Sequence, residues 1–582
     1  MNISENKLLI TTALQMTWKL DSRMPSVFLG EWCKLYSESS KWSNVNSEVL
    51  PFHWDDRNKL KNDHDYLKAL YERILPLIGE KLNSFHGTNE PVQFWRIVLG
   101  PWLITYLPIV FDRWEMLRLA FEKNKKYTTA KFTENVEMSI AQHFSDFLEI
   151  MQTDRWNFGL YQRILVDYYE EHIDFFEVEL PNIIFEETLK SKTTVRSKLM
   201  NAVDKFLGFF GGKKGIMFYN SYFPPRKLIL LNLSLYQIPR LYVNEFVYPS
   251  YQKSDSGLRN SIMLDFDKTS DFEFFLGKQL FKDMPISYLE NFKTIYEKAD
   301  NILLQHKSIL TANSYWCDEV FKFWAAKKQQ SGTELIICQH GGSFPPLYDT
   351  FQHEEDISDI NVIWFKPYHY KHIQLAPTKV IKGKAINNTD GNCAVLGYEG
   401  PRYSYRATAA GLTHQGLAFF EQTANFCDLL DETVKNKLKI RPYFEMGWET
   451  KQRYIDRFSE VTVDYKTTYK YFLQEAKLIV CTYPQTTFSE AMASGKPTIL
   501  LYIPEFNELI PEAKELIEAL KSVNIIFSDP IKAANHVNSN WDSIEEWWAS
   551  EEVMKVKQLY FDTALKISNN WKNEWIQFLK HT

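Results

Sequence analysis

The chain has 582 residues, of which 45% are apolar and 15% aromatic, and its formal net charge at pH 7 is −6. That length exceeds what a single hydrophobic core normally serves, so two or more domains are expected. The negative net charge argues against general nucleic-acid binding, which needs a basic surface. The six cysteines are scattered without a CxxC pair, a pattern typical of reduced core cysteines inside a cell.

The first part of the chain mixes strand-like and helical patterns. Residues 8–13 lack a basic flank and predict a first strand rather than a signal peptide. Residues 27–30 predict a strand and a tight turn, and 59–86 carry apolar residues at helical spacing. Helices are expected to dominate 92–175. The longest apolar run, 94–111, contains one arginine and two prolines and predicts a buried helix pair rather than a membrane span.

The central part contains a basic segment, two strand-like runs and a hinge. Residues 190–214 are rich in Lys and Arg and predict a core-facing helix, with a helix lying on an anionic membrane as the alternative. Runs 227–233 and 335–338 predict buried parallel strands, the second preceded by a helix over 313–329. The pattern weakens over 366–392, which indicates a hinge.

The last third alternates strands and helices, which predicts a doubly wound parallel sheet. Its tail, from about residue 540, is helical and Trp-rich. The predicted order is strand 394–396, helix 413–434, strands 437–442 and 461–463, helix 467–475, strand 477–482, helix 486–494, strand 497–502, helix 507–521 and strand 523–527.

Segment 478–501 is the most informative part of the chain, because it predicts a strand, a polar turn, a short helix, a glycine stop and a second strand. The hydroxyls of Thr486 and Thr487 and free backbone N–H groups then lie at a helix N-terminus, which suits a phosphate. Glu490, one turn further, can accept hydrogen bonds from ribose hydroxyls. Thr482 and Gln485 are further candidate contacts. The alternative is that Gly-Lys-Pro simply ends a helix.

A second motif, Gln339-His340-Gly341-Gly342, directly follows the strand at 335–338. Two glycines let the backbone approach a ligand closely or take positive φ. His340 is then presented at the carboxyl end of a strand, and Glu354 and Asp359 follow in the chain. These three residues are candidate catalytic groups, since imidazole and carboxylates can act as general base for an acceptor hydroxyl. The alternative is a glycine turn with a hydrogen-bonding histidine.

Other charged residues are candidates for substrate contacts. Arg441 follows a predicted strand and can bind a phosphate or carboxylate, although a surface ion pair explains it equally well. Near the N-terminus, Glu31, His53, Asp55 and Asp56 can line an acceptor groove, or can belong to buried structural networks. No Asp-x-Asp and no His/Cys cluster marks an obvious site for a divalent ion, so no metal site is predicted.

Together these residues resemble a bacterial family of transferases associated with O-antigen and other surface-polysaccharide loci, along almost the whole chain. The layout is also similar to the GT-B glycosyltransferases, and that resemblance implies an α/β fold with two Rossmann-type domains facing a cleft. It further implies a helix-rich acceptor domain over 1–385, a donor domain over 386–582 and C-terminal helices that return across the cleft. The matching segments are 9–14, 28–33, 53–57, 100–102, 339–342, 354–359 and 486–490.

The resemblance implies a metal-independent glycosyltransferase in the cytoplasm, possibly peripheral to the inner membrane. The helix N-terminus is similar to that of transferases using CMP-activated acidic sugars, so a CMP-nonulosonate donor is favoured, with UDP-, GDP- and dTDP-sugars open. The acceptor is expected to be a glycan or lipid-linked glycan, and no cofactor is required. The alternatives are a polyol-phosphate transferase of the CDP-glycerol type and a non-catalytic nucleotide-binding scaffold.

Overall fold

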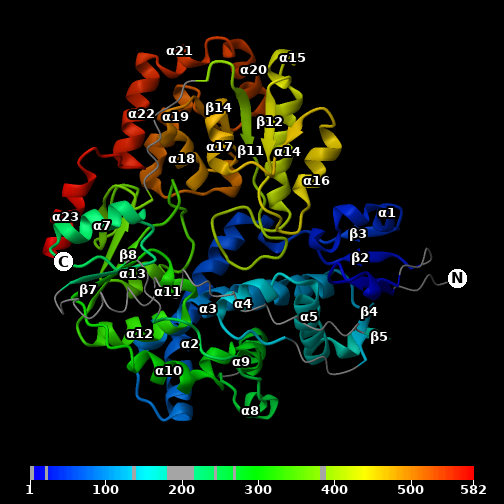
Figure 1. Cartoon of the computed structure of the whole chain (residues 1–582). Helices are drawn as coiled ribbons and strands as arrows, with labels where there is room; N and C mark the ends of the chain where they lie inside the picture. Colours follow the sequence, from blue (N-terminus) through cyan, green and yellow to red (C-terminus); the bar gives the residue numbers. More distant parts are fainter. Residues whose placement is uncertain are drawn as a thin grey trace.

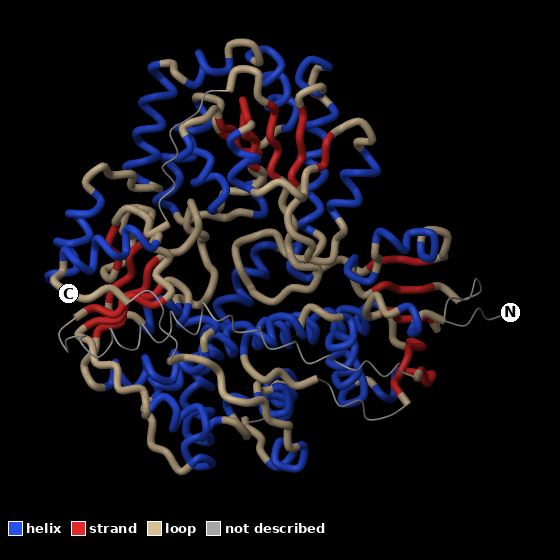
Figure 2. Tube along the Cα trace, in the orientation of Figure 1, coloured by secondary structure: helices blue, strands red, loops and turns tan. Residues whose placement is uncertain are grey.

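The computed structural model describes residues 6–19, 24–133, 139–179, 215–240, 245–266, 270–379 and 388–582. Within these ranges the chain forms three separate parallel β-sheets surrounded by helices, and Figure 2 shows them as three groups of strands. We call the parts built on them the N-terminal lobe (6–179), the middle lobe (215–379) and the C-terminal lobe (388–565). The predicted α/β class with parallel sheets is confirmed.

The N-terminal sheet has the strand order β3-β2-β1-β4-β5, and the middle sheet has the order β10-β9-β8-β7-β6. The sequence predicts one Rossmann-like domain over 1–385, whereas the structure has these two sheets in that range. Their strands are β1 Lys7–Ile10, β2 Ser26–Phe28, β3 Ser47–Val49, β4 Tyr127–Phe132 and β5 Ile173–Val178, then β6 Ile216–Tyr219, β7 Ser308–Thr311, β8 Glu334–Cys338, β9 Ile360–Ile363 and β10 His372–Gln374.

The C-terminal sheet has the order β13-β12-β11-β14-β15-β16, and every pair in it is parallel. The order reverses between β11 and β14, and ligands of such sheets bind outside the carboxyl ends of the strands at that point. The turn between β14 and α18 begins there. The strands are β11 Asn392–Leu396, β12 Leu438–Arg441, β13 Thr462–Val463, β14 Ala476–Cys481, β15 Thr498–Leu501 and β16 Ile526–Phe527.

The helices of the first two lobes surround one shared core, in which strands β1, β2 and β8 contribute to the same cluster of buried side chains. Figure 1 shows the long helices α2 and α3 running between the N-terminal and middle sheets. These helices are α1 Ser39–Trp42, α2 Arg57–His86, α3 Val92–Lys123, α4 Phe144–Ile150, α5 Asp154–Tyr168, α7 Pro225–Ser234, α8 Ser256–Ser261, α9 Asp271–Asp283, α10 Phe292–Asp300, α11 Ser314–Cys317, α12 Glu319–Gln330 and α13 His353–Ile357.

The predicted helix pair over 94–111 is wrong, because α3 is one helix that continues through Pro101 and Pro108. Each proline removes only one helical hydrogen bond, and burial on all sides of the helix holds the remaining turns in place. By length and composition, α3 is the single helix in the described ranges that is able to cross a membrane. In this structure 94% of its most apolar 18-residue stretch is buried inside the protein.

Two further expectations concern the middle of the chain. Residues 227–233, predicted as a strand, belong to helix α7, which begins at Pro225 and buries Leu228 and Leu231. Short apolar runs fit a buried helix face and a strand equally, which explains the error. The basic segment 190–214 lies outside the described residues.

The C-terminal lobe follows the predicted alternation closely, and its last helix returns to the middle lobe. Trp575 of α23 is buried beside the middle sheet and donates its indole N–H to the Ala376 carbonyl at 3.0 Å, and Figure 1 shows α23 next to α7. The helices are α14 Gln415–Asp428, α15 Glu432–Lys435, α16 Thr450–Arg457, α17 Tyr469–Gln474, α18 Thr486–Ser494, α19 Lys514–Ser522, α20 Pro530–Asn540, α21 Ile544–Trp548, α22 Glu551–Thr563 and α23 Trp571–His581.

Candidate active site

His340 follows strand β8 at the carboxyl edge of the middle sheet. Its Nδ1 lies 3.1 Å from the carbonyl oxygen of Ala312, which only accepts hydrogen bonds. Nδ1 therefore carries the proton, and Nε2 keeps its lone pair. The ring stacks on Tyr222 with 5.8 Å between centroids. Burial lowers the pKa of His340 below its ordinary value, while the bond to Ala312 raises it by less. The neutral ring is therefore the form expected at pH 7.

The two glycines after His340 meet helix α18 of the C-terminal lobe. The backbone N–H of Gly342 donates to Thr486 Oγ1 at 2.7 Å, and Ser489 Oγ donates to the Gly342 carbonyl at 3.0 Å. A Cβ on Gly341 would lie 2.4 Å from Thr486 Oγ1, and Gly342 has φ +115°. The two glycines therefore let the middle lobe pack closely against helix α18 of the C-terminal lobe. The structure brings the two most informative sequence motifs together.

A cavity of about 420 Å³ opens beside His340, mostly within the middle lobe, with Gln485 at its C-terminal-lobe side. We call it the acidic cavity, because Asp349, Glu354 and Glu355 line it. Glu354 accepts hydrogen bonds from the Tyr315 hydroxyl at 2.8 Å and the Thr350 hydroxyl at 3.0 Å. Burial raises the pKa of Glu354. His340 and Glu354, both predicted as catalytic, thus line one cavity.

A second cavity, of about 190 Å³, lies between α18, the middle lobe and the segment leading to α23. We call it the lysine cavity, after Lys227, Lys379 and Lys566, which line it together with Glu490. Lys379 Nζ lies 2.9 Å from Glu490 Oε1, and Lys566 pairs with a carboxylate of α23 at 3.1 Å. Lys227 lies over the Trp571 ring, 4.7 Å from its centroid. This cavity carries more positive than negative side chains.

Four other predicted residues have structural partners. Thr482 is fully buried and donates to the Leu396 carbonyl at 2.8 Å. The Thr487 hydroxyl bonds that of Tyr483, and Arg441 donates to the Thr467 carbonyl at 2.5 Å. Asp359 precedes β9 and accepts from the Leu335 N–H at the start of β8, so it lies at the end of the sheet opposite to His340. The structure does not group Asp359 with the catalytic candidates.

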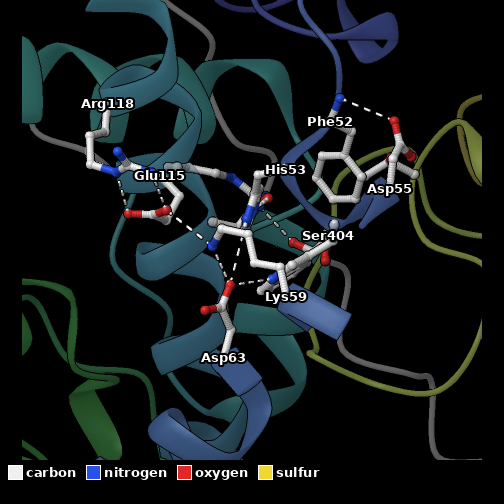
Figure 3. A network of polar contacts seen from close by, with 12 residues as sticks. Phe52, His53, Asp55, Lys59, Asp63, Glu115, Arg118 and Ser404 are labelled. Carbon is white, nitrogen blue, oxygen red and sulfur yellow. Dashed lines mark hydrogen bonds and ion pairs between the residues drawn. The ribbon is translucent and has the colours of Figure 1, made fainter. Parts of the chain in front are cut away.

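Two of the N-terminal candidates, the buried His53 and the exposed Asp55, belong to polar networks of their lobe, as Figure 3 shows. His53 Nε2 lies 2.9 Å from an Asp112 carboxylate oxygen, with the His53 side chain fully buried. Asp55 accepts from the Phe52 N–H and from the Gln415 amide of the C-terminal lobe. None of these residues lines either cavity, so their role at an acceptor groove stays a prediction.

The other two N-terminal candidates have local roles. Asp56 caps helix α2 by accepting from the N–H groups of Asn58 and Lys59, and Glu31 pairs with Lys34 at 2.9 Å.

The network of Figure 3 joins the N-terminal lobe to the C-terminal lobe. Arg113 donates to the Ser404 carbonyl at 2.8 Å, and Ser404 lies in the loop that follows β11. These carboxylates and basic groups therefore hold the N-terminal and C-terminal lobes together.

The sequence gives no local signal for the lysine cavity, because its three lysines come from distant segments that only the fold assembles. Asn361, which lines the acidic cavity, and Tyr560, whose hydroxyl bonds Ser343 and Ser489 at 3.0 Å each, were likewise not anticipated. Among the described residues, no group of three or more His, Cys, Asp or Glu side chains is placed to hold a metal ion.

Comparisons with known proteins give one family match and two similar solved structures. A family model described as LIC12162 family transferase matches residues 7–579. Among solved structures, the chain is similar to MurG of Acinetobacter baumannii, with 12% identity, a TM-score of 0.33, and 64% of this chain and 100% of that chain covered. It is also similar to UDP-GlcNAc 2-epimerase of Neisseria meningitidis bound to UDP-GlcNAc, with 12% identity, a TM-score of 0.33, and 63% and 100% covered. No curated relative matches the chain.

Proposed function

The chain belongs to the LIC12162 transferase family, and we propose that it is a glycosyltransferase that moves a sugar from a nucleotide donor to a glycan acceptor. One observation carries this proposal: the His340 loop of the middle lobe meets the N-terminus of α18 through the 2.7 Å bond from Gly342 to Thr486. This contact brings two functional groups close together. One is His340, whose Nε2 has a free lone pair, and the other is a helix N-terminus suited to an anion.

The lysine cavity is the proposed place of the nucleotide donor. Glu490 would accept hydrogen bonds from the ribose, exchanging part of its contact with Lys379 for the ligand. Lys227, Lys379 and Lys566 would neutralise the donor's negative charges. The phosphate would extend from the cavity towards Gln485 and Thr486, one turn before Glu490 at the N-terminus of α18. Three lysines suit a donor with two negative charges, which are a carboxylate and a phosphate in the CMP-nonulosonate that we favour and two phosphates in UDP-, GDP- and dTDP-sugars. Thr487 and Arg441 do not line this cavity, and both bind protein groups, so we give them no part in donor binding.

The proposed chemistry needs one proton transfer. Nε2 of His340 takes the proton of the acceptor hydroxyl while that oxygen forms a bond to the anomeric carbon. The bond from the anomeric carbon to the phosphate oxygen breaks, and its electron pair leaves with the nucleotide. The positive end of α18 and the lysines stabilise the charge that develops on the leaving phosphate. The amino groups would supply this charge without a metal ion, so we propose that transfer needs none.

The test is a thermal-shift series with CMP, UDP, GDP, dTDP and CDP, followed by product analysis of transfer with the best donor. We expect one nucleotide to stabilise the protein most, a glycosidic product, and a rate that a chelator leaves unchanged. A phosphodiester product would instead show a polyol-phosphate transferase. Stabilisation without donor hydrolysis or transfer would show a binding scaffold.

We place the reaction in the cytoplasm, where nucleotide sugars are available. The six cysteines support this proposal, since none is paired and five are buried as thiols. The acceptor would be a surface-polysaccharide glycan or its lipid-linked precursor, reached by contact with the inner face of the membrane. Fractionation of cells that express the chain tests this placement.

A further inference from the structure

Asn361 is a buried amide whose partners are missing from the protein. It lies in β9 beside Ile337 of β8, and 3% of its surface is exposed. Its backbone N–H donates to the Lys371 carbonyl at 2.9 Å, but its side-chain oxygen and nitrogen have no hydrogen-bond partner in the part of the chain that the structure describes. Buried amides are nearly always hydrogen-bonded. Because the side chain lines the acidic cavity, a bound molecule there can supply both bonds.

The rest of the cavity lining has the composition of a sugar-binding site. Asp349, Glu354 and Glu355 supply carboxylates, and Phe365 and Tyr368 supply aromatic faces. Carboxylates and amides accept and donate hydrogen bonds to sugar hydroxyls, and aromatic rings pack against the apolar face of a sugar ring. Within the described chain, no Lys or Arg lines this cavity. An anionic ligand would therefore meet carboxylates and no Lys or Arg in the described lining.

Contacts with neighbouring side chains hold two of these carboxylates in fixed positions. Glu355 lies 2.9 Å from His372 Nε2, and Asp349 lies 3.7 Å from Arg406. The volume of about 420 Å³ falls within the usual range of ligand pockets, and His340 lies on the same lining. A hydroxyl of a molecule in this cavity can therefore approach the His340 side chain.

We propose that the acidic cavity is the acceptor site, and that it takes the end of an uncharged or amino-bearing sugar and excludes an acidic one, with Asn361 binding it directly. This inference rests on the proposed function, since it assigns the acceptor side of the same reaction. It separates the two substrates by charge, with the anionic donor in the lysine cavity and the polyhydroxylated acceptor in the acidic cavity.

The experiment measures binding of three probes by saturation-transfer NMR: N-acetylglucosamine, glucosamine and glucuronate. Wild-type protein is compared with Asn361→Leu, which keeps the branched shape of the side chain and removes the amide. The matched control is Asn232→Leu in α7, because the Asn232 amide donates to the Leu228 carbonyl and accepts from Gln237. We expect wild type to bind the first two probes and not glucuronate. Asn361→Leu should lose this binding with an unchanged or higher melting temperature.

The control separates a ligand-binding amide from a structural one. Asn232→Leu should lower the melting temperature and keep probe binding. The proposal is overturned if wild type binds none of the probes, if glucuronate binds as well as N-acetylglucosamine, or if Asn361→Leu binds as wild type does. Nucleotide stabilisation is measured on the same samples: its absence with probe binding intact would contradict the proposed donor site and leave the sugar site standing.

Discussion

The backbone N–H of Gly342 donates to Thr486 Oγ1 at 2.7 Å, so a glycine loop of the middle sheet is bonded to the first residue of a helix in the C-terminal lobe. Ser489, one turn along α18, closes the contact by donating to the Gly342 carbonyl. The loop and the helix thus fix each other's position. The imidazole that precedes the glycines is thereby held near the helix N-terminus.

The first prediction concerns the space at this contact. Gly341→Ala would place a Cβ 2.4 Å from Thr486 Oγ1, and such overpacking costs about 1–3 kcal/mol. We expect a lower melting temperature and slower transfer. Adding Thr486→Ala removes the overlapping oxygen, and the remaining Thr486 Cβ is at an ordinary contact distance of 3.6 Å. The double variant should therefore be more stable than Gly341→Ala alone. Differential scanning calorimetry measures both changes.

The control for this pair is Gly341→Ala with Thr486→Val, which keeps an atom at the position of Oγ1. It should be as unstable as Gly341→Ala alone. Equal stability of all three variants with wild type would show that the lobes separate in solution and that the contact is not populated.

The second prediction concerns His340 as the base. His340→Ala removes the group that takes the acceptor proton, and general-base catalysis contributes roughly 10²–10⁴-fold to rate. We expect kcat to fall by that order while nucleotide stabilisation in a thermal-shift assay stays as in wild type, since the donor binds in the lysine cavity. His172→Ala, at an exposed position of the N-terminal lobe, is the control. Wild-type kcat in His340→Ala would remove His340 from the mechanism.

The third prediction is the pH dependence of transfer. Burial lowers the pKa of His340 below its ordinary value of 6.5, so the base is neutral and competent at pH 7. As pH falls through the lowered pKa, the ring gains a proton and Nε2 loses its lone pair. We expect kcat/KM to be level near pH 7 and to fall only below about pH 6.5. A profile that already falls between pH 8 and pH 7 would contradict this assignment.

The sequence predicted the C-terminal lobe well because its alternation is regular. Strand β14, helix α18 and strand β15 were placed within a residue or two, since a buried apolar run, a polar turn and Gly495 with φ +78° mark each boundary. The position of His340 beside the acidic cavity also follows from its place directly after the carboxyl end of β8, whereas Glu354 comes from helix α13.

The N-terminal half was harder to predict for physical reasons. Its strands are three to six residues long, separated by long helices, so periodicity does not show how they divide between two sheets. His53 and Asp56 stand beside aromatic residues, as the polar residues of a sugar site would. In the structure His53 is a buried hydrogen-bond partner of Asp112 and Asp56 is a helix cap. The lysine cavity has no sequence signature, because Lys227, Lys379 and Lys566 meet only when α23 returns to the middle lobe.

The last prediction concerns the pair of Lys379 and Glu490. Their 2.9 Å contact in the lysine cavity puts the proposed ribose acceptor beside a proposed phosphate partner. Glu490→Gln keeps the shape and removes the charge, so we expect weaker nucleotide stabilisation because the ribose loses its charged acceptor, worth about 1.5–3 kcal/mol. Lys379→Met should weaken stabilisation by pyrophosphate-bearing nucleotides more than that by the free nucleoside. Isothermal titration of both single variants and the double variant measures how the two side chains couple. Additive losses with no preference for the phosphate would show that the ligand does not lie between them.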